Sequence, residues 1–336
     1  MSSNKWLLAR PRGGLNDTLC QMEKCWRFAE KTGRQLVFDT KDSGLLMDFH
    51  EVFSVRSDRN TVMPHLLTEE LIKELNQLSA FPREIQGRVT EYEKIKNGHD
   101  DFFTLQSATA LKFPLTTDFP EEVVVYEAMG GGVDSFCTLE RIVLQPWLAS
   151  SIIIALKGLP NRYISVHVRH SDMQTDYQGL FAHVKRRNVD KLPVFIASDN
   201  DAVVDDARSI LGSDTCFTLA KVSERKGNPL HDASPNLSDA DRRIRTVEAL
   251  SELFALCGAD QFFYTEVTNR TGVSGFSRLA AYLARNPCLR RALLDIETDA
   301  DEHRECQPVL VAPLHRRLLE TVRWRSSNCA RSNVNR

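Results

Sequence analysis

Residues 163–172 bring together side chains that can bind a phosphate group. The stretch begins as a short apolar run rich in β-branched residues, which predicts a buried strand of a parallel sheet. His167, Arg169, His170 and Asp172 fall at its far end, and ligands of open α/β sheets bind beyond the carboxyl ends of strands. Because a guanidinium presents a planar pair of donors to two phosphate oxygens, we predict a phosphorylated ligand. The alternative is a strand end whose charges are simply solvated.

Two loops offer backbone N–H groups to an anion, because each lies where a predicted helix begins. The first loop, residues 12–16, contains Gly14 and Asn16, and the second, residues 271–277, contains Ser274 and Ser277. Neither loop matches the dinucleotide fingerprint G-x-G-x-x-G or a Walker loop. Each loop therefore fits either a phosphate cradle or an ordinary turn with a helix cap.

Two acidic triplets, residues 199–201 and 239–241, could hold a divalent cation against a nucleotide-sugar diphosphate. Each triplet also begins a predicted helix, where aspartate is favoured as a cap, and we interpret both as caps. No set of histidine, cysteine and aspartate residues has a metal-ligand spacing, and the sequence has no G-x-S-x-G elbow. The sequence therefore predicts no metal site.

The elements that must position these residues alternate between strand and helix. A strand at 6–9, a helix at 18–32 and a strand at 36–39 form a βαβ unit, with Asn16 or Asp17 as the helix cap and Gly33 after its end. A strand at 122–126 precedes a single helix at 138–157, kinked at Pro146. Residues 42–115 show helix-like pieces around 68–78 but no clear order. In the second half we predict strands at 163–168, 194–198, 215–218 and 261–265, alternating with helices at 179–188, 202–211, 239–257 and 276–284.

This alternation predicts an α/β protein with two Rossmann-like domains facing each other across a cleft. The expected boundaries are 1–157 for the N-terminal domain, 158–320 for the C-terminal domain and 321–336 for a flexible tail. Hydrophobic residues make up 42% of the 336-residue chain and charged residues 26%, the usual balance of a globular protein.

Charge and hydropathy exclude several classes of partner. A formal net charge of −2 argues against nucleic acid or an anionic membrane as the main partner. No apolar run approaches the roughly 18 residues of a membrane span, and no secretory apolar core follows the N-terminus. The eight cysteines show no C-x-x-C pair and no zinc spacing, so we expect reduced thiols and a cytoplasmic protein.

Three segments of the second half resemble, in order and spacing, the motif set of the α1,6-fucosyltransferase and protein O-fucosyltransferase superfamily, which includes bacterial nodulation chitooligosaccharide fucosyltransferases. Residues 166–172 resemble its H-x-R-x-x-D stretch, residues 194–199 its strand ending in A-T/S-D, and residues 248–280 its carboxylate-bearing helix and phosphate loop. Residues 13–16 are similar to the opening of the superfamily. Most of residues 42–120 has no counterpart in the resemblance.

The resemblance implies a GT-B-like fold, with an acceptor-side N-terminal domain and a C-terminal domain that binds the nucleotide sugar. It also implies GDP-fucose as donor, an oligosaccharide or glycan as acceptor, and no cofactor or metal. On the family's pattern Arg169 clamps the diphosphate and His167 lies near the guanine. The other donor contacts that it implies involve Asp199, Glu252, Ser274, Ser277, Gly14 and Asn16.

The chain departs from the α1,6 branch where that branch has a lysine after the aspartate of the first motif and a glutamate four residues later. Met173 and Tyr177 occupy these positions, which leaves Asp172 and Asp176 as candidates for the base that deprotonates the acceptor. The resemblance implies direct displacement with inversion of the fucose anomeric carbon. Arg169 and the Ser274 loop would then stabilise the charge on the leaving GDP.

Two other classes of function remain open from the residues. Arg169-His170-Ser171 is similar to the R-H-G sequence of histidine phosphatases, in which His170 would be the nucleophile. The missing glycine and the position in the middle of the chain argue against this class. The departures at Met173 and Tyr177 also fit a protein that binds a GDP-sugar without catalysis.

Overall fold

The computed structural model describes residues 5–57, 61–97, 102–171, 174–219, 237–266, 272–296 and 310–311. These residues belong to two compact units. The first unit comprises the described parts of Met1–Ala149, Leu230–Val247 and Leu293–Asp295, and the second those of Ser150–Pro229, Glu248–Ala292 and Ile296–Arg336. Each unit is built on its own parallel sheet.

The first unit contains a five-stranded parallel sheet in the order β4-β2-β1-β8-β5. The chain starts at the central strand, adds β2 and β4 on one side, and later adds β5 and β8 on the other. The switch point of this sheet therefore lies between β1 and β8. The strands are β1 (Trp6–Pro11), β2 (Gln35–Phe38), β4 (Pro64–His65), β5 (Ala80–Phe81) and β8 (Val123–Ala128).

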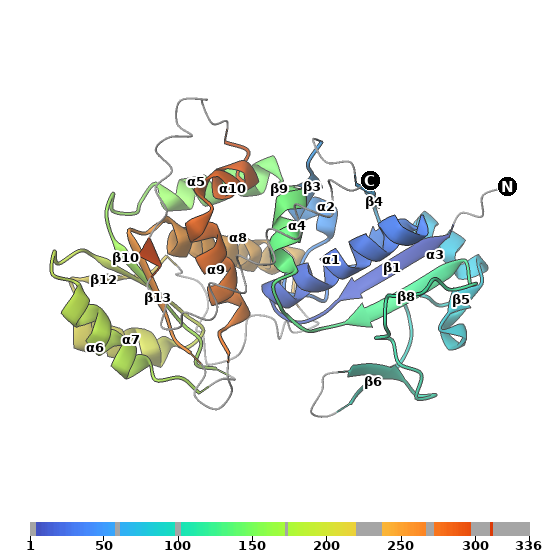
Figure 1. Cartoon of the computed structure of the whole chain (residues 1–336), viewed down its shortest axis with the longest axis horizontal. Coiled ribbons are helices and arrows are strands. Elements are labelled where there is room, and N and C mark those ends of the chain that lie inside the picture. The colour runs from blue at the N-terminus through green and yellow to red at the C-terminus, as the bar shows by residue number, and fades with distance from the viewer. Residues whose placement is uncertain are drawn as a thin grey trace. The chain divides into compact units, whose positions relative to one another are not determined.

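Helix α1 (Leu15–Thr32) runs along one face of β1 and β8, as Figure 1 shows. Its buried side chains include Met22 and Trp26, so the 3.6-residue apolar period of the sequence faces the sheet. Gly33 ends the helix in the left-handed conformation, with φ 69°, as predicted. The predicted cap was wrong, because the N-cap residue is Gly14 and Asn16 already lies in the first turn.

Residues 42–115 fold into short elements that include the predicted helix, α3 (Glu69–Gln77), whose N-cap Thr68 accepts a hydrogen bond from the Leu71 amide at 3.2 Å. Besides the sheet strands β4 and β5, the others are α2 (Phe49–Val52), β3 (Phe53–Val55), a 3-10 turn η1 (Arg83–Ile85) and the antiparallel pair β6 (Lys94–Asn97) and β7 (Phe102–Leu105).

The single helix predicted at 138–157 was wrong. The segment contains α4 (Ser135–Arg141), the strand β9 (Ile142–Leu144) and α5 (Pro146–Leu156), and β9 pairs antiparallel with β3. Ile142 and Val143 are β-branched and favour an extended backbone. Pro146 lacks the amide hydrogen that a continuous helix would need, so it begins α5 instead.

The second unit contains a five-stranded parallel sheet in the order β12-β11-β10-β13-β14. This is the Rossmann order, and its switch point lies between β10 and β13. The strands are β10 (Ile164–Val168), β11 (Val194–Ser198), β12 (Cys216–Phe217), β13 (Gln261–Tyr264) and β14 (Leu310–Val311). The helices that lie wholly or mostly in this unit are α6 (Tyr177–Arg187), α7 (Asp201–Leu211), α8 (Asp239–Gly258), α9 (Gly275–Arg285) and α10 (Pro287–Leu293). The part of α8 up to Val247 belongs to the first unit. The predicted alternation of strands and helices is confirmed.

The cysteines differ from the expectation of reduced thiols throughout. Cys137, on α4, is disulfide-bonded, whereas Cys20, Cys25, Cys216, Cys257 and Cys288 are free. The spacing of cysteines in a sequence does not show which thiols the fold brings together, so this bond could not be predicted.

Among the described residues, no helix is both long enough and apolar enough to span a membrane.

We predict that Gly44→Ala destabilises the first unit. A Cβ at Gly44 would lie 2.4 Å from the Leu15 amide nitrogen and 2.5 Å from the Gly14 carbonyl carbon, so backbone would have to move. Overpacking of this kind costs roughly 1–3 kcal/mol, which urea unfolding would measure. In the matched control Gly132→Ala, the nearest atom to the new Cβ is the Cys20 Sγ at 3.8 Å, and we expect a change within about 0.5 kcal/mol. Equal losses in the two variants would contradict the close approach.

Candidate functional site

The carboxyl end of β10 lies at the switch point of the second sheet and carries His167. Odd-numbered residues of β10 face α8 and α9, since the Ser165 hydroxyl donates to the Leu256 carbonyl and His167 contacts Ser277. His167 Nδ1 lies 2.6 Å from the Ser277 Oγ, and the imidazole packs 5.2 Å from the Phe276 ring. His167 is therefore buried and held against the start of α9.

Asp199 organises the loop that follows β10. It lies directly after β11, which pairs with β10, and only 6% of its surface is exposed. One carboxylate oxygen accepts from the His170 amide at 2.8 Å, and the other accepts from the Ser171 hydroxyl at 2.6 Å and lies 3.1 Å from Arg169 Nε. The structure therefore brings Arg169 and Asp199 together as an ion pair, with the carboxylate turned toward the loop.

A second set of bonds braces the same loop from its other side. The Thr175 hydroxyl donates to the Arg169 carbonyl at 3.1 Å and lies 3.3 Å from His170 Nδ1. The His170 ring packs edge-on against Tyr177, whose hydroxyl donates to Asp206 at 2.8 Å. Backbone and side chains on both sides of Arg169 are thus fixed before any ligand arrives.

Of the two candidate bases, Asp172 and Asp176, only Asp176 lies among the described residues. Asp176 is the N-cap of α6, where its Oδ1 accepts from the Gly179 amide at 2.9 Å. Asp172 lies outside the described residues. The role of either carboxylate as a base stays a prediction.

Helix α9 begins at the same switch point and points its N-terminus toward that edge of the sheet. Ser274 is its N-cap residue, buried to 4% exposure, and its hydroxyl makes no capping bond. Ser277, one turn later, is fully buried, and its hydroxyl is hydrogen-bonded to the His167 imidazole. Of the two predicted serines, Ser274 has the place that suits an anion at the free N–H groups of the helix, while Ser277 supports His167.

Glu252 and the acidic triplets complete the predicted set. Glu252 is buried in α8 with 4% exposure. In the triplet 199–201, the cap of α7 is Asn200, which accepts from the Ala202 amide at 3.0 Å, and not one of the aspartates that we expected to cap the helix. Among the described residues, no group of three or more His, Cys, Asp or Glu side chains is arranged to hold a metal ion.

Gly14 and Asn16 belong to the first unit, where both serve the local fold. Gly14 is the close backbone neighbour of Gly44. The Asn16 amide donates to the Gly132 carbonyl at 3.3 Å, and its Oδ1 accepts from the Ser135 hydroxyl at 2.8 Å. Asn16 therefore ties the start of α1 to the loop after β8, and its predicted contact with the donor stays a prediction.

The sequence reasoning missed a buried charged group at the switch point of the first sheet, which we call the Glu127 cluster. Glu127 of β8 is paired in register with Arg10 of β1. Its carboxylate lies 2.5 Å from Arg12 Nε and accepts from the Tyr92 hydroxyl at 2.6 Å and from Lys94. The cluster consists of Arg10, Arg12, Asp39, Asp42, Tyr92, Lys94 and Glu127. A glutamate inside the apolar strand 123–128 was the signal that could have revealed it.

Burial and neighbouring positive charges shift the pKa of the Glu127 carboxyl group in opposite directions. Burial by itself would raise its pKa, but the positive charges of Arg12, Arg10 and Lys94 outweigh burial and lower the pKa to about 2. Glu127 is therefore ionised at neutral pH although its side chain is completely buried.

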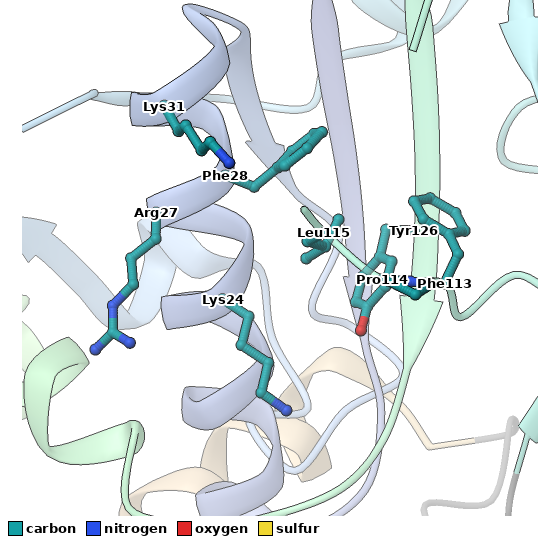
Figure 2. A pocket seen from close by; sticks show the side chains of 8 residues that line it. All are labelled: Lys24, Arg27, Phe28, Lys31, Phe113, Pro114, Leu115 and Tyr126. Atoms are coloured by element: carbon teal, nitrogen blue, oxygen red, sulfur yellow. The ribbon is translucent and has the colours of Figure 1, made fainter. Parts of the chain in front are cut away.

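A separate pocket of about 400 Å³ lies beside α1 in the first unit. Figure 2 shows its two walls, α1 on one side and residues 113–115 with Tyr126 of β8 on the other. Arg27, on its rim, is paired with Glu23 at 2.8 Å and Asp134 at 3.3 Å. None of the site residues predicted from the sequence lines this pocket, and none of its lining residues belongs to the Glu127 cluster.

Comparison with known proteins finds no matching family model and no matching curated protein. Among solved structures the chain is similar to the fucosyltransferase NodZ from Bradyrhizobium, with 18% identity, a TM-score of 0.54 and coverage of 83% of this chain and 93% of that chain. NodZ alpha-1,6-fucosyltransferase co-crystallised with GDP (17% identity, TM-score 0.52) and soaked with GDP-fucose (18% identity, TM-score 0.50) each match over 83% of this chain and 92% of theirs. The chain thus has the NodZ fold, and the resemblance seen in its motifs is confirmed at the level of the fold.

We predict that Glu127 makes the stability of the first unit fall in acid. The pKa of Glu127 is about 2 in the folded protein and about 4.3 in the unfolded chain. Its contribution to the free energy of unfolding is therefore complete at pH values above about 4.3 and is lost as the pH falls toward 2. The loss is about 3 kcal/mol, at about 1.4 kcal/mol per pKa unit. Urea unfolding at several pH values between 5 and 2 should show a shallower acid loss for Glu127→Gln than for the wild type. Parallel pH curves would contradict this assignment.

Proposed function

We propose that the protein is a glycosyltransferase that moves fucose from GDP-fucose to a hydroxyl group of an oligosaccharide or glycan. The observation that carries the proposal is the position of Arg169, held by Asp199 at the carboxyl end of β10 and at the switch point of the second sheet. The NodZ structures with GDP and GDP-fucose share this fold. Together these support a nucleotide-sugar donor bound by the second unit.

The second unit offers two ways to neutralise a diphosphate. The Arg169 guanidinium supplies charge-assisted hydrogen bonds, and the N-terminus of α9 supplies backbone N–H groups beside the Ser274 hydroxyl. β10 and β13 are adjacent, and α9 follows β13, so both groups lie at one end of neighbouring strands. His167 and Glu252 are proposed at the guanine, as the family resemblance implies.

The proposed reaction is a direct displacement. The acceptor oxygen forms a bond to the fucose anomeric carbon while the bond from that carbon to the GDP oxygen breaks, which inverts the anomeric configuration. Negative charge grows on the leaving diphosphate, where Arg169 and the α9 N-terminus stabilise it. The acceptor proton passes to a carboxylate, for which we favour Asp172, because Asp176 is occupied as the α6 cap. In this scheme Arg169 and the α9 N-terminus, and no metal ion, neutralise the charge of the diphosphate.

We further propose the GT-B arrangement, in which domains 1–157 and 158–320 face each other across the reaction site and 321–336 is a tail. The N-terminal domain would take the acceptor. A cytoplasmic location stays a prediction. The disulfide at Cys137 is a feature more typical of oxidising compartments.

We expect Arg169→Ala to weaken GDP binding by roughly tenfold to a hundredfold, because it removes hydrogen bonds worth about 1.5–3 kcal/mol to a charged group. Calorimetric titration with GDP, GDP-fucose, GDP-mannose and UDP-sugars measures this and tests the donor. Arg208→Ala, which removes an exposed arginine of the same unit, is the matched control. Wild-type GDP affinity in Arg169→Ala, or a preference for UDP-sugars, would contradict the proposal. Donor binding without transfer to any acceptor would favour a non-catalytic GDP-sugar-binding protein.

A double-mutant cycle tests whether Asp199 acts on the donor only through Arg169. We expect Asp199→Ala to weaken GDP binding roughly tenfold in the wild-type background, because Arg169 and its loop lose their anchor. In the Arg169→Ala background the same change should have little further effect. If the double variant instead lost GDP affinity by the product of the two single losses, Asp199 would contact the donor directly. Asp205→Ala, at an exposed position of α7, controls for a general effect of removing a carboxylate.

A further inference from the structure

The pocket beside α1 combines an apolar wall with positively charged side chains. Its volume of about 400 Å³ lies within the range of roughly 300–1,000 Å³ that small-molecule sites occupy. The two walls in Figure 2 come from the second half of α1 and from residues 113–115 with Tyr126. All of these residues belong to the first unit, so the pocket does not depend on the second unit.

The pocket lies over a face of the first sheet, away from its carboxyl edge. Arg34 follows α1, and its Nη1 donates to the Trp6 carbonyl at 3.0 Å, at the amino end of β1. The second half of α1 therefore runs back toward the amino ends of the strands. The predicted donor contacts Gly14 and Asn16 lie at the opposite end of this helix. The pocket is thus separate from the residues proposed to bind the donor and from the edge where α/β sheets bind substrates.

Aromatic rings form the apolar part of the lining. Phe28 and Tyr126 are 2% and 3% exposed, and Phe113 packs edge-on against Tyr126 with ring centroids 5.2 Å apart. The Tyr126 hydroxyl donates to the Gln21 side chain at 3.3 Å, so the polar end of this ring is already bonded. A ligand with an aromatic body suits such a wall, because rings pack against one another with a gain beyond the area that they bury.

The positive charges of the lining exceed the negative ones. Lys24, Arg27 and Lys31 line the pocket, and none of the described residues that line it is acidic. Arg27 is already paired with two carboxylates, and Figure 2 shows its side chain turned away from the opposite wall. Lys31 donates to the neutral Thr116 carbonyl at 2.8 Å. Within the described part of the chain, Lys24 forms no ion pair and no side-chain hydrogen bond.

Charge and apolar surface together identify the kind of ligand. A bare inorganic anion would leave the aromatic wall in contact with water. A neutral apolar molecule would leave the two lysine amines without an acceptor. A molecule that joins an aromatic body to one anionic group satisfies both parts of the lining, because an ammonium group and a carboxylate form a charge-assisted hydrogen bond.

We propose that the pocket beside α1 binds a small aromatic carboxylate, with its ring against the aromatic wall and its carboxylate at the amines of Lys24 and Lys31. The occupant is neither the nucleotide-sugar donor nor the glycan acceptor. The site does not rest on the proposed function, because its residues take no part in the proposed reaction.

The test compares 2-naphthoate with 2-naphthamide, which has nearly the same shape and no charge, by calorimetry and ligand-observed NMR on the full chain. We expect 2-naphthoate to bind with a Kd of about 1 mM or lower, roughly tenfold more tightly than 2-naphthamide. Octanoate and inorganic phosphate represent an acyl chain with the same charged group and an anion without an apolar body. Both should bind more weakly than 2-naphthoate.

Variants of the two lysines locate the carboxylate. Lys24 is half-buried and Lys31 is exposed, so Lys24→Gln and Lys31→Gln should leave the fold intact. In the double variant we expect 2-naphthoate to bind roughly tenfold more weakly and 2-naphthamide to change less than about twofold, so that the two probes bind alike. Lys73→Gln, at an exposed position of α3 in the same unit, is the matched control and should keep the preference for the carboxylate.

A variant of the opposite wall gives a second readout. Leu115→Asp adds a negative charge to the lining, so it should weaken 2-naphthoate more than 2-naphthamide. The proposal is overturned if 2-naphthoate does not bind at about 10 mM, if the double lysine variant keeps the preference for it, or if octanoate or phosphate binds more tightly.

GDP provides the test that the pocket is separate from the donor site. Saturating GDP should leave the affinity for 2-naphthoate unchanged within about twofold. Displacement of 2-naphthoate by GDP would assign the probe to the donor site and would also overturn the proposal. If GDP itself does not bind, the proposed function fails while the result with 2-naphthoate stands by itself.

Discussion

Parallel pairing on both sides of β10 decides where the charged residues of the second unit can lie. β11 and β13 flank this strand in register, so their carboxyl ends meet at one edge of the sheet. Asp199 thereby reaches the loop after β10, and Ser277 of α9 reaches His167, across 110 residues of sequence. Contacts with Asp199 and Thr175 consequently hold the described residues on both sides of Arg169.

The same constraint produces a different chemical environment in the first unit. There β1 and β8 bring Arg10 and Glu127 into register, and Arg12 comes directly after the end of β1. Because the positive charges around Glu127 outweigh its burial, the carboxyl group remains ionised in the interior. Two five-stranded parallel sheets with different strand orders thus present an anchored arginine in one unit and a balanced set of charges in the other.

The likeness to NodZ establishes the fold, while the case for the reaction depends on individual residues. Tyr177 shows why this distinction matters. It stands where the α1,6 branch has a glutamate, and here its hydroxyl donates to Asp206 while its ring packs against His170. The residue therefore supports the loop after β10.

Local patterns in the sequence determined most of the elements. The strands at 6–9 and 194–198, the helix of the first βαβ unit and its terminal Gly33 follow from periodicity and backbone preference, which act over a few residues. The helix predicted across 138–157 failed because β9 gains its partner β3 from a segment about 90 residues away. Among the candidate site residues, the sequence by itself pointed to Arg169, His167 and Asp199 through spacing within motifs. Only the tertiary structure showed that Asp199 holds Arg169 and that Arg10, Arg12 and Glu127 share one buried cluster, because strand pairing and burial depend on the whole sheet.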